Sequence, residues 1–453
     1  MDIGNKLEAI VFASKKYDSL FPFDLYWQAA CLPVANQNNI VAIVSSLKGL
    51  GFKTVHVVIG YRQEQVKALL SGFDEVVYHQ GDRLPPELLA KPLLVIDGAV
   101  YSDPSLLSGL VEKHLESGSS VLSVRPKDEY NRSIDGFGIK LADDRVAKMF
   151  GHARDHYIDY LANGIYLLDP KVLSLQDSTD LGLEYVPSGG MPPLTFYVEA
   201  MIQKALELGE PFEYVVDPSA INLRFPWNLF LANQKAAQKI CGAIKEDDLG
   251  EGTTVAENIL KYAPIKTGKN CLIRDNVIIR GPVVLGDNVT IESGAILEGD
   301  NIIGSNSFVK DYAKLVKGTV LGNRCRVGFN AELGGLYFDD VSAIHSLEIY
   351  GIMGKSVDIA AGCTVGFMRF DDSEHLPRVN GKTFRGKYAN AVCVGDYTRM
   401  GIMNFFHPGV RVGANCSLGP GAIIENDVPH GTLVRVKQEQ EYRSWSTDRY
   451  GWQ

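Results

Sequence analysis

The sequence predicts two domains of different fold class, an open α/β domain followed by a parallel β-helix. Three observations lead to this prediction. The chain has 453 residues, which is too long for one compact core. Its second half repeats every six residues, whereas its first half alternates short apolar runs with helical patterns. Glycine makes up 45 of the 453 residues, above the usual share of about 7%, and this favours an architecture with many tight turns.

The first half is expected to form an open, mostly parallel sheet that is covered by helices on both faces. Apolar runs bounded by turn residues predict strands at 8–12, 54–59, 75–79, 92–97, 120–124, 136–141, 163–168 and 212–216. Helical patterns lie near 38–50, 62–71, 103–116, 193–208 and 226–244. Ligands of such sheets bind beyond the carboxyl ends of the strands, so we expect any site of this domain there.

The second half is predicted to be a parallel β-helix of triangular cross-section. From Thr267 the sequence divides into hexads, and their leading residue is aliphatic at every step from Ile273 to Val327. These side chains are expected to point inward and stack, while Gly, Asn and Asp turn the chain at the corners. At three hexads per coil, the repeats would give roughly six or seven coils. Several of the seven cysteines fall on small positions of the hexad, so we expect buried thiols rather than disulfides or zinc ligands.

Two stretches interrupt the repeat, and both are expected to leave the coil as loops that carry function. They are residues 333–352 and 367–393. The predicted domains are therefore an α/β domain at 1–225, a connecting helix and linker at 226–262, the β-helix at 263–435, and a C-terminal tail at 436–453.

The composition argues against several classes of partner. The net charge of −9 offers no basic face to nucleic acid or to an anionic membrane surface. No apolar run approaches the ~20 residues of a membrane span, and the first residues show no secretory signal pattern. We therefore expect a soluble, cytoplasmic protein.

Specific motifs add a resemblance to known families. The hexads resemble the left-handed β-helix of hexapeptide-repeat acyltransferases, which implies trimers with acyl-CoA and acceptor bound between neighbouring helices. The stretch FASKKYDSLFPFDLYWQAACLPVANQNNI resembles, without a gap, the opening of the sugar-1-phosphate nucleotidyltransferases. LANGIYLLDPKVL and INLRFPWNLFLAN resemble their later motifs. As a whole, the chain resembles the bifunctional N-acetylglucosamine-1-phosphate uridylyltransferase/glucosamine-1-phosphate acetyltransferases, especially their archaeal members.

The resemblance implies a Rossmann-like nucleotidyltransferase fold for the first domain, but the reacting groups of that family are missing. Its glycines fall on Lys15 and Tyr17, its arginine on Ser19, its Pro-Lys pair on Gln28 and Ala29, and its metal-binding aspartate on Ala99. The remaining candidates for sugar or nucleotide binding are Asp97, Asn163 and Asn222, and Mg²⁺ is not expected. Since single losses of this kind cost about 10²–10⁵ in rate, we expect nucleotidyl transfer to be lost. The alternative is an active enzyme with a rebuilt phosphate site around Asp97 and Lys15 or Lys16.

The acyltransferase half keeps more of the family pattern. His345 lies one residue from the position of the family's base, and His407 faces outward in a later hexad, so each is a candidate general base. Arg399, Arg411 and Lys437 are candidate contacts for the phosphates of acetyl-CoA or another acyl-CoA. His375 lies in the second loop and is expected to be solvated. No metal site is predicted.

These observations lead to one hypothesis and two competitors. The leading hypothesis is a diverged family member whose β-helix assembles as a homotrimer or hexamer and transfers an acyl group to an amino sugar phosphate. The first competitor is a non-catalytic regulatory or scaffolding homologue that pairs with an active paralogue. The second is the nucleotidyltransferase with a rebuilt phosphate site.

Overall fold

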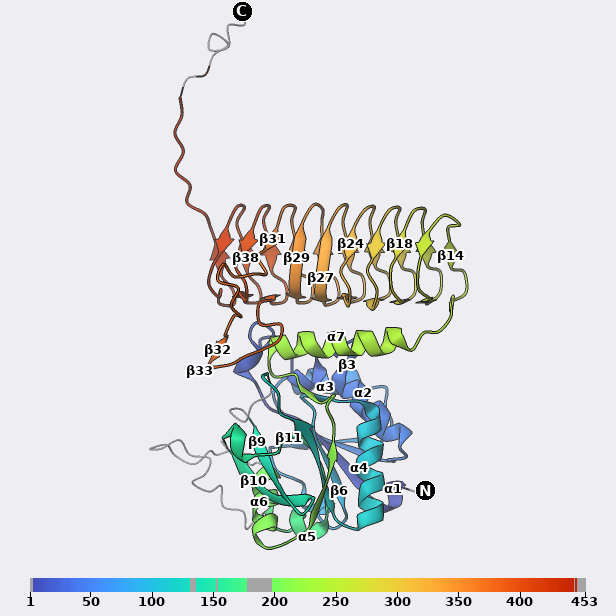
Figure 1. Ribbon diagram of the computed structural model, residues 1–453, viewed down its shortest axis with the longest axis vertical. Helices are drawn as coiled ribbons and strands as arrows, with labels where there is room; N and C mark the ends of the chain where they lie inside the picture. Colours follow the sequence, from blue (N-terminus) through green and yellow to red (C-terminus); the bar gives the residue numbers. More distant parts are fainter. Residues whose placement is uncertain (1–2, 131–135, 152–153, 177–197, 444, 446–453) are drawn as a thin grey trace, which may run out of the picture.

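A computed structural model describes residues 3–130, 136–151, 154–176, 198–443 and 445. The β-helix lies across one end of the molecule, and helix α7 (Pro226–Gly242) runs along its length between the β-helix and the α/β domain (Figure 1). Within the described residues, no helix is long and apolar enough to cross a membrane.

The α/β domain is built on a nine-stranded mixed sheet in the order β10-β9-β11-β6-β1-β4-β5, with β8 pairing both β11 and β12. Its strands are β1 Glu8–Ala13, β4 Val55–Ile59, β5 Val76–Gln80, β6 Leu93–Asp97, β8 Ser120–Pro126, β9 Phe137–Ala142, β10 Arg145–Gly151, β11 Tyr160–Leu168 and β12 Phe212–Val216. Strands β1, β4, β5 and β6 run parallel, as the alternating pattern predicted. The hairpin of β9 with β10 is antiparallel, and the sequence pattern missed β10.

Helices cover both faces of this sheet, so each face has its own apolar core. Residues of α2 and α4 join the core on one face, and residues of α6 join the core on the other. The helices are α1 Ile3–Lys6, α2 Asn39–Gly49, α3 Gln63–Leu70, α4 Pro104–Ser117, α5 Pro170–Leu173 and α6 Val198–Glu207. The predicted helix at 193–208 is therefore confirmed from Val198 onward, whereas residues 193–197 lie outside the described part of the chain.

The β-helix has three walls of short parallel strands. The first wall contains β14 Thr254–Val255, β17 Leu272–Ile273, β20 Thr290–Ile291, β23 Phe308–Val309, β26 Arg326–Val327, β28 Ser342–Ala343, β30 Asp358–Ile359, β35 Arg399–Met400, β38 Ser417–Leu418 and β40 Leu433–Val434. The second contains β15 Leu260–Lys261, β18 Ile278–Ile279, β21 Ile296–Leu297, β24 Lys314–Leu315, β31 Thr364–Val365, β36 Phe405–Phe406 and β39 Ile423–Ile424. The third contains β16 Ile265–Thr267, β19 Val283–Leu285, β22 Asn301–Ile303, β25 Val320–Leu321, β34 Val392–Val394 and β37 Arg411–Val412. Ile273 pairs with Ile291 one coil later, so a regular coil has 18 residues, or three hexads.

The aliphatic leaders fill the interior of this triangle, as predicted. All seven cysteines are buried. The stack is longer than predicted, because the first wall has ten strands. It begins at Thr254, within the predicted linker, and it continues through the segment where the hexad period is lost.

The segment 333–352 was expected to leave the coil as a loop, but the structure keeps it in the walls. Strands β27 (Glu332–Tyr337) and β29 (Glu348–Met353) each run without a turn from the second wall into the third. Glu332 pairs with Glu348, so the coil here has 16 residues instead of 18, and this shortening breaks the hexad period. Gly335 makes the straightened corner possible, because its φ is +114° and a Cβ there would lie 2.1 Å from the carbonyl oxygen of Gly351.

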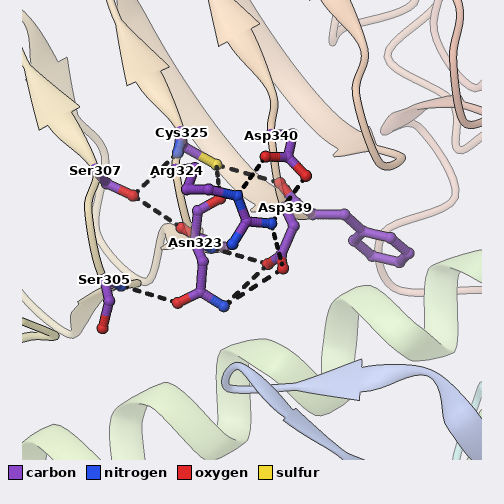
Figure 2. Close-up of polar contacts among 9 residues, drawn as sticks. Ser305, Ser307, Asn323, Arg324, Cys325, Asp339 and Asp340 are labelled. Atoms are coloured by element: carbon purple, nitrogen blue, oxygen red, sulfur yellow. Dashed lines mark hydrogen bonds and ion pairs between the residues drawn. The ribbon is translucent and has the colours of Figure 1, made fainter. Parts of the chain in front are cut away.

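Carboxylates secure the chain where the coils shorten. Figure 2 shows Asn323 accepting from the backbone N–H of Ser305 and donating to Asp339. Beside it, the Arg324 guanidinium contacts Asp340 at 2.6 and 2.9 Å and Asp339 at 3.2 Å. This ion pair lowers the pKa of Asp340. The corner is therefore held by side chains of two successive coils.

The third wall is covered by α7, which explains why its outward residues are apolar. Ile302, Val320, Leu336 and Ile352 belong to one buried cluster together with residues of α7. Phe230 of α7 lies close to the straightened corner, since a Cβ on Gly335 would come within 2.8 Å of its ring. The two domains thus share a core.

A second contact between the domains comes from residues 21–27, which we call the bridging segment. Phe23 stacks on Phe338 with ring centroids 5.5 Å apart, and the Trp27 indole donates to Asp396 at 2.9 Å. Asp24 lies 3.2 Å from the His430 ring nitrogen. The bridging segment therefore contacts corners from the middle of the β-helix, at Phe338, to its last coil, at His430.

Candidate functional site

The long loop between β31 and β34 is the one interruption that does leave the coil. It lengthens one coil, so that Met353 pairs with Val394, 41 positions later, instead of 18. Its base is closed by Asn390, whose amide donates to the Phe367 carbonyl oxygen at 3.0 Å. Phe384 packs near the rings of Phe225 and Trp227, at the start of α7. The loop is thus fixed at both its base and its far side.

This loop and the last coils enclose a groove of about 950 Å³, which we call the C-terminal groove. It is lined by residues 366–378 of the loop together with coil residues 406–411 and 425–427. Met368 and Phe370 are exposed at its mouth. Its volume falls within the range of pockets that hold small ligands, about 300–1,000 Å³.

Two of the five candidate acyl-transfer residues lie in this groove. His407 is exposed on its rim, and Arg411 is held by Asp427 through contacts of 2.6 and 3.0 Å. The Arg411 guanidinium also lies 5.5 Å from the ring of Phe21 in the bridging segment. His407 and Arg411 therefore line the same groove, although His407 follows β36 and Arg411 lies in β37.

The other three candidates lie elsewhere. His345 is exposed at a corner between the first and second walls. Arg399 faces outward from the first wall, so it does not share a wall with Arg411, because two hexads carry the chain around to a different side. Lys437 is exposed beyond the last strand. The structure does not bring these three residues together within one chain, and their roles stay predictions.

His375 was expected to be solvated, but the structure half-buries it in the C-terminal groove. Its ring packs on Gly409, and its backbone N–H donates to Asn390 at 2.7 Å. Burial lowers the pKa of His375; Arg369 and Arg411 act in the same direction, and Asp427 opposes them. The sequence showed that the loop interrupts the repeat, but no periodicity within the loop indicated that it folds back over the coil.

The α/β domain has a second cavity at the carboxyl ends of β1 and β6, which we call the N-terminal pocket. Its volume is only about 60 Å³. Asp97, the last residue of β6, lines it together with Lys15 and Tyr17, which stand where the resembled nucleotidyltransferases have glycine. Tyr166 donates to Glu199 at 3.0 Å, and burial raises the pKa of this carboxyl group.

The two candidate asparagines are engaged outside this pocket. Asn163 donates to the Ser123 hydroxyl at 2.6 Å. Asn222 accepts from the backbone N–H and the side chain of Arg224, at 3.0 and 2.7 Å. Neither residue lines the N-terminal pocket. Within the described residues, no group of three or more His, Cys, Asp or Glu side chains is placed to hold a metal ion.

Comparison with known proteins agrees with the two-domain architecture. A family model described as bacterial transferase hexapeptide (six repeats) matches residues 264–299. A bifunctional protein GlmU of Methanocaldococcus jannaschii is 23% identical over 451 residues, which cover 96% of this chain and 99% of the relative. Over nearly its whole length, the chain is thus similar to a bifunctional GlmU protein. Because this match runs through both domains, the resemblance does not rest on the β-helix alone.

Other relatives match a smaller part of the chain. A bifunctional sugar-1-phosphate nucleotidylyltransferase/acetyltransferase of Sulfurisphaera tokodaii is 29% identical over 121 residues, which cover 26% of this chain and 30% of the relative. A bifunctional protein GlmU of Methanococcus maripaludis is 28% identical over 27% of the chain and 30% of the relative. A solved structure of a putative glucose-1-phosphate thymidylyltransferase from Bacillus anthracis covers 51% of the chain at 16% identity with a TM-score of 0.42, which is too low to support any conclusion.

Proposed function

We propose that the C-terminal groove transfers an acyl group from acyl-CoA to the amine of an amino sugar or amino sugar phosphate. The observation that carries this proposal is the groove itself, which holds two imidazoles and Arg411 in a cavity of about 950 Å³. A neutral imidazole takes the proton of an attacking amine, and cationic side chains suit the phosphates of the donor. The relative named as a bifunctional sugar-1-phosphate nucleotidylyltransferase/acetyltransferase supports the choice of acetyl-CoA as the first donor to test.

We further propose that the α/β domain no longer transfers nucleotides. A nucleoside triphosphate needs a pocket of several hundred Å³, whereas the N-terminal pocket measures about 60 Å³. Its lining includes three carboxyl residues, Asp82, Asp97 and Glu199, against one lysine, Lys15. Carboxylates facing a triphosphate repel it, and the side chain of Tyr17 occupies space that a glycine leaves open to phosphate. This pocket is better suited to a small neutral or cationic group than to a nucleotide.

We also propose that the chain assembles as a homotrimer through the corner between the first and second walls. Tyr312, Phe329, Ile402 and Met403 are exposed along this corner. Tyr312 and Met403 occupy left-handed positions, with φ of +57° and +56°, where bulky side chains are disfavoured. Large apolar residues at strained, exposed positions favour burial against another copy. An active paralogue with the same fold would be a competing partner at this corner.

The acyl-transfer proposal is tested with purified full-length protein, acetyl-CoA and glucosamine 1-phosphate, with release of the CoA thiol as the readout. We expect thiol release with this acceptor or another member of a panel of amino sugars, and CoA binding by calorimetry. Absence of both binding and thiol release across the panel would refute the proposal. Calorimetry with UTP or dTTP and Mg²⁺ runs in parallel, and metal-dependent nucleotide binding would overturn the second proposal.

Light scattering tests the assembly. The wild-type protein is expected as a trimer, and Tyr312→Ser combined with Met403→Ser is expected to dissociate it. A wild-type monomer would contradict the proposal, and a hexamer would show that trimers pair. Purification from the native source with a second, homologous chain would instead favour pairing with a paralogue.

A further inference from the structure

The loop histidine, His375, is held more firmly than the other imidazole of the C-terminal groove. Its backbone N–H donates to the Asn390 side chain at 2.7 Å, and the same Asn390 closes the loop through Phe367. Its ring lies on Gly409, where a Cβ would come within 2.4 Å of the ring carbon Cδ2. The φ of +77° at Gly409 also disfavours any side chain at that position. The imidazole is therefore fixed from the loop side and the coil side.

The charges that face His375 come from three segments. Asp427 in the last coil favours the protonated ring, whereas Arg369 in the loop and Arg411 in β37 disfavour it. Glu425 and His407 line the same groove. Burial is the largest influence, and its direction places the pKa of His375 below the ordinary value of 6.5. The ring is thus mainly neutral at pH 7, with a free nitrogen lone pair.

His407 lacks these constraints. Its side chain is exposed on the rim, and its backbone N–H only continues the coil by donating to Ile424 at 3.0 Å. A general base needs both a fixed position and the neutral form at working pH. Of the two groove histidines, His375 therefore has the more firmly fixed position.

We propose that His375 is the general base of acyl transfer in the C-terminal groove, which rests on the proposed function of that groove. The amine nitrogen of the acceptor attacks the thioester carbonyl carbon and forms the new C–N bond. His375 takes the proton that this nitrogen loses. The C–S bond breaks as the tetrahedral intermediate collapses, and the departing thiolate of CoA receives the proton from the imidazolium. No further reactant is required.

The test compares wild type, His375→Gln and His407→Gln in the full-length protein, by thiol release and by calorimetry with CoA. His375→Gln is expected to lower kcat by about 10²–10⁴-fold while CoA still binds, since the substitution removes the base and not the donor site. His375→Ala with added imidazole is expected to recover part of the rate. His156→Gln, an exposed histidine of the α/β domain, is the matched control and is expected to keep the wild-type rate.

The pH profile provides a readout that a merely structural role would not change. Wild-type kcat/KM is expected to fall on the acid side with a midpoint below pH 6.5. Arg369→Gln removes a cation that lowers the pKa of His375, so it is expected to move this acid limb to higher pH. An unmoved limb, or a His375→Gln variant with the wild-type rate and profile, would overturn the proposal while acyl transfer itself stands. A wild type that neither binds CoA nor releases thiol would refute the proposed function instead, and this inference with it.

Discussion

The C-terminal groove and the N-terminal pocket differ in how each is built on its scaffold. One side of the groove is a loop that leaves a regular coil, so substitutions on that side need not disturb the stacked aliphatic core. The pocket lies between core strands, and its lining residues Lys15, Tyr17 and Gln28 continue into the bridging segment. That segment is committed to contacts with the β-helix. An inserted loop can therefore remain a site, whereas the corresponding turn of the α/β domain has become part of an interface.

The largest effect on stability is expected at the contact between the bridging segment and the β-helix. Phe23 is fully buried against Phe338, so Phe23→Ala is expected to lower the free energy of unfolding by about 3–5 kcal/mol, as measured by denaturant titration. Phe370→Ala removes an equal ring from the exposed mouth of the groove and is expected to leave stability unchanged. If the two variants are equally stable, the ring buried at the interface contributes no more to stability than the ring exposed at the groove.

The next effect is the pH dependence of the same interface. Burial raises the pKa of Asp396 to about 6, compared with about 3.9 in an unfolded chain. The folded state thus holds this proton more tightly, so the stabilisation is complete below about pH 4 and is lost as pH rises through about 6. Asp396→Asn cannot ionise and is expected to remove a decline of about 2–3 kcal/mol between these pH values.

Unfolding of wild type and Asp396→Asn at a series of pH values measures this difference. The asparagine of the variant keeps an oxygen that can accept from the Trp27 indole and the Lys355 backbone N–H, which both donate to Oδ1 of Asp396 in the wild type. Asp275→Asn, at an exposed coil corner, is the control and is expected to keep the wild-type profile. Parallel profiles for all three proteins would show that Asp396 does not titrate as described.

A smaller effect is expected from a matched pair of glycines, Gly409 in the groove and Gly381 elsewhere in the long loop. Gly409 and Gly381 share a φ of +77°, but a Cβ on Gly409 would clash with the His375 ring, whereas Gly381 has open space around it. Each alanine substitution is expected to cost about 1–3 kcal/mol for the left-handed backbone. Only Gly409→Ala is expected to weaken CoA binding and slow thiol release as well. Loss of activity in both variants would place the cause in loop stability rather than in the position of His375.

The smallest effect on stability is expected at a corner of the β-helix that is remote from the groove. Arg324 contacts Asp339 and Asp340 at a half-exposed corner (Figure 2). Exposed ion pairs contribute about 0–1 kcal/mol, so Arg324→Met is expected to lower stability by less than about 1 kcal/mol, as seen by thermal unfolding. Acyl transfer is expected to be unaffected. A change in thiol release would show that the coil corners and the groove are coupled.

The sequence predicted the architecture well because each half follows a simple period. Inward aliphatic residues every six positions specify the β-helix, and apolar runs specify β1, β4 and β6. The prediction failed at 333–352, where two residues are missing from a coil and the period disappears although the strands continue. A shortened coil and a loop inserted between coils both interrupt the six-residue period, so the sequence alone does not distinguish them.

The candidate site was harder to predict for a related reason. His407 and Arg411 belong to the repeat, so their outward positions follow from the hexad. His375 lies in a loop without period, and its burial depends on Gly409 and Asn390, which are far from it in sequence. The small volume of the N-terminal pocket likewise depends on tertiary packing around Glu199 and Tyr166.

The bridging segment has a consequence for the history of the chain. If the first domain were deleted, the β-helix would expose the ring of Phe338 and leave the buried carboxyl group of Asp396 without the Trp27 indole. A shorter gene that encoded the β-helix alone would therefore begin with a folding defect. The α/β domain thus supports the folding of the β-helix whether or not it also transfers nucleotides.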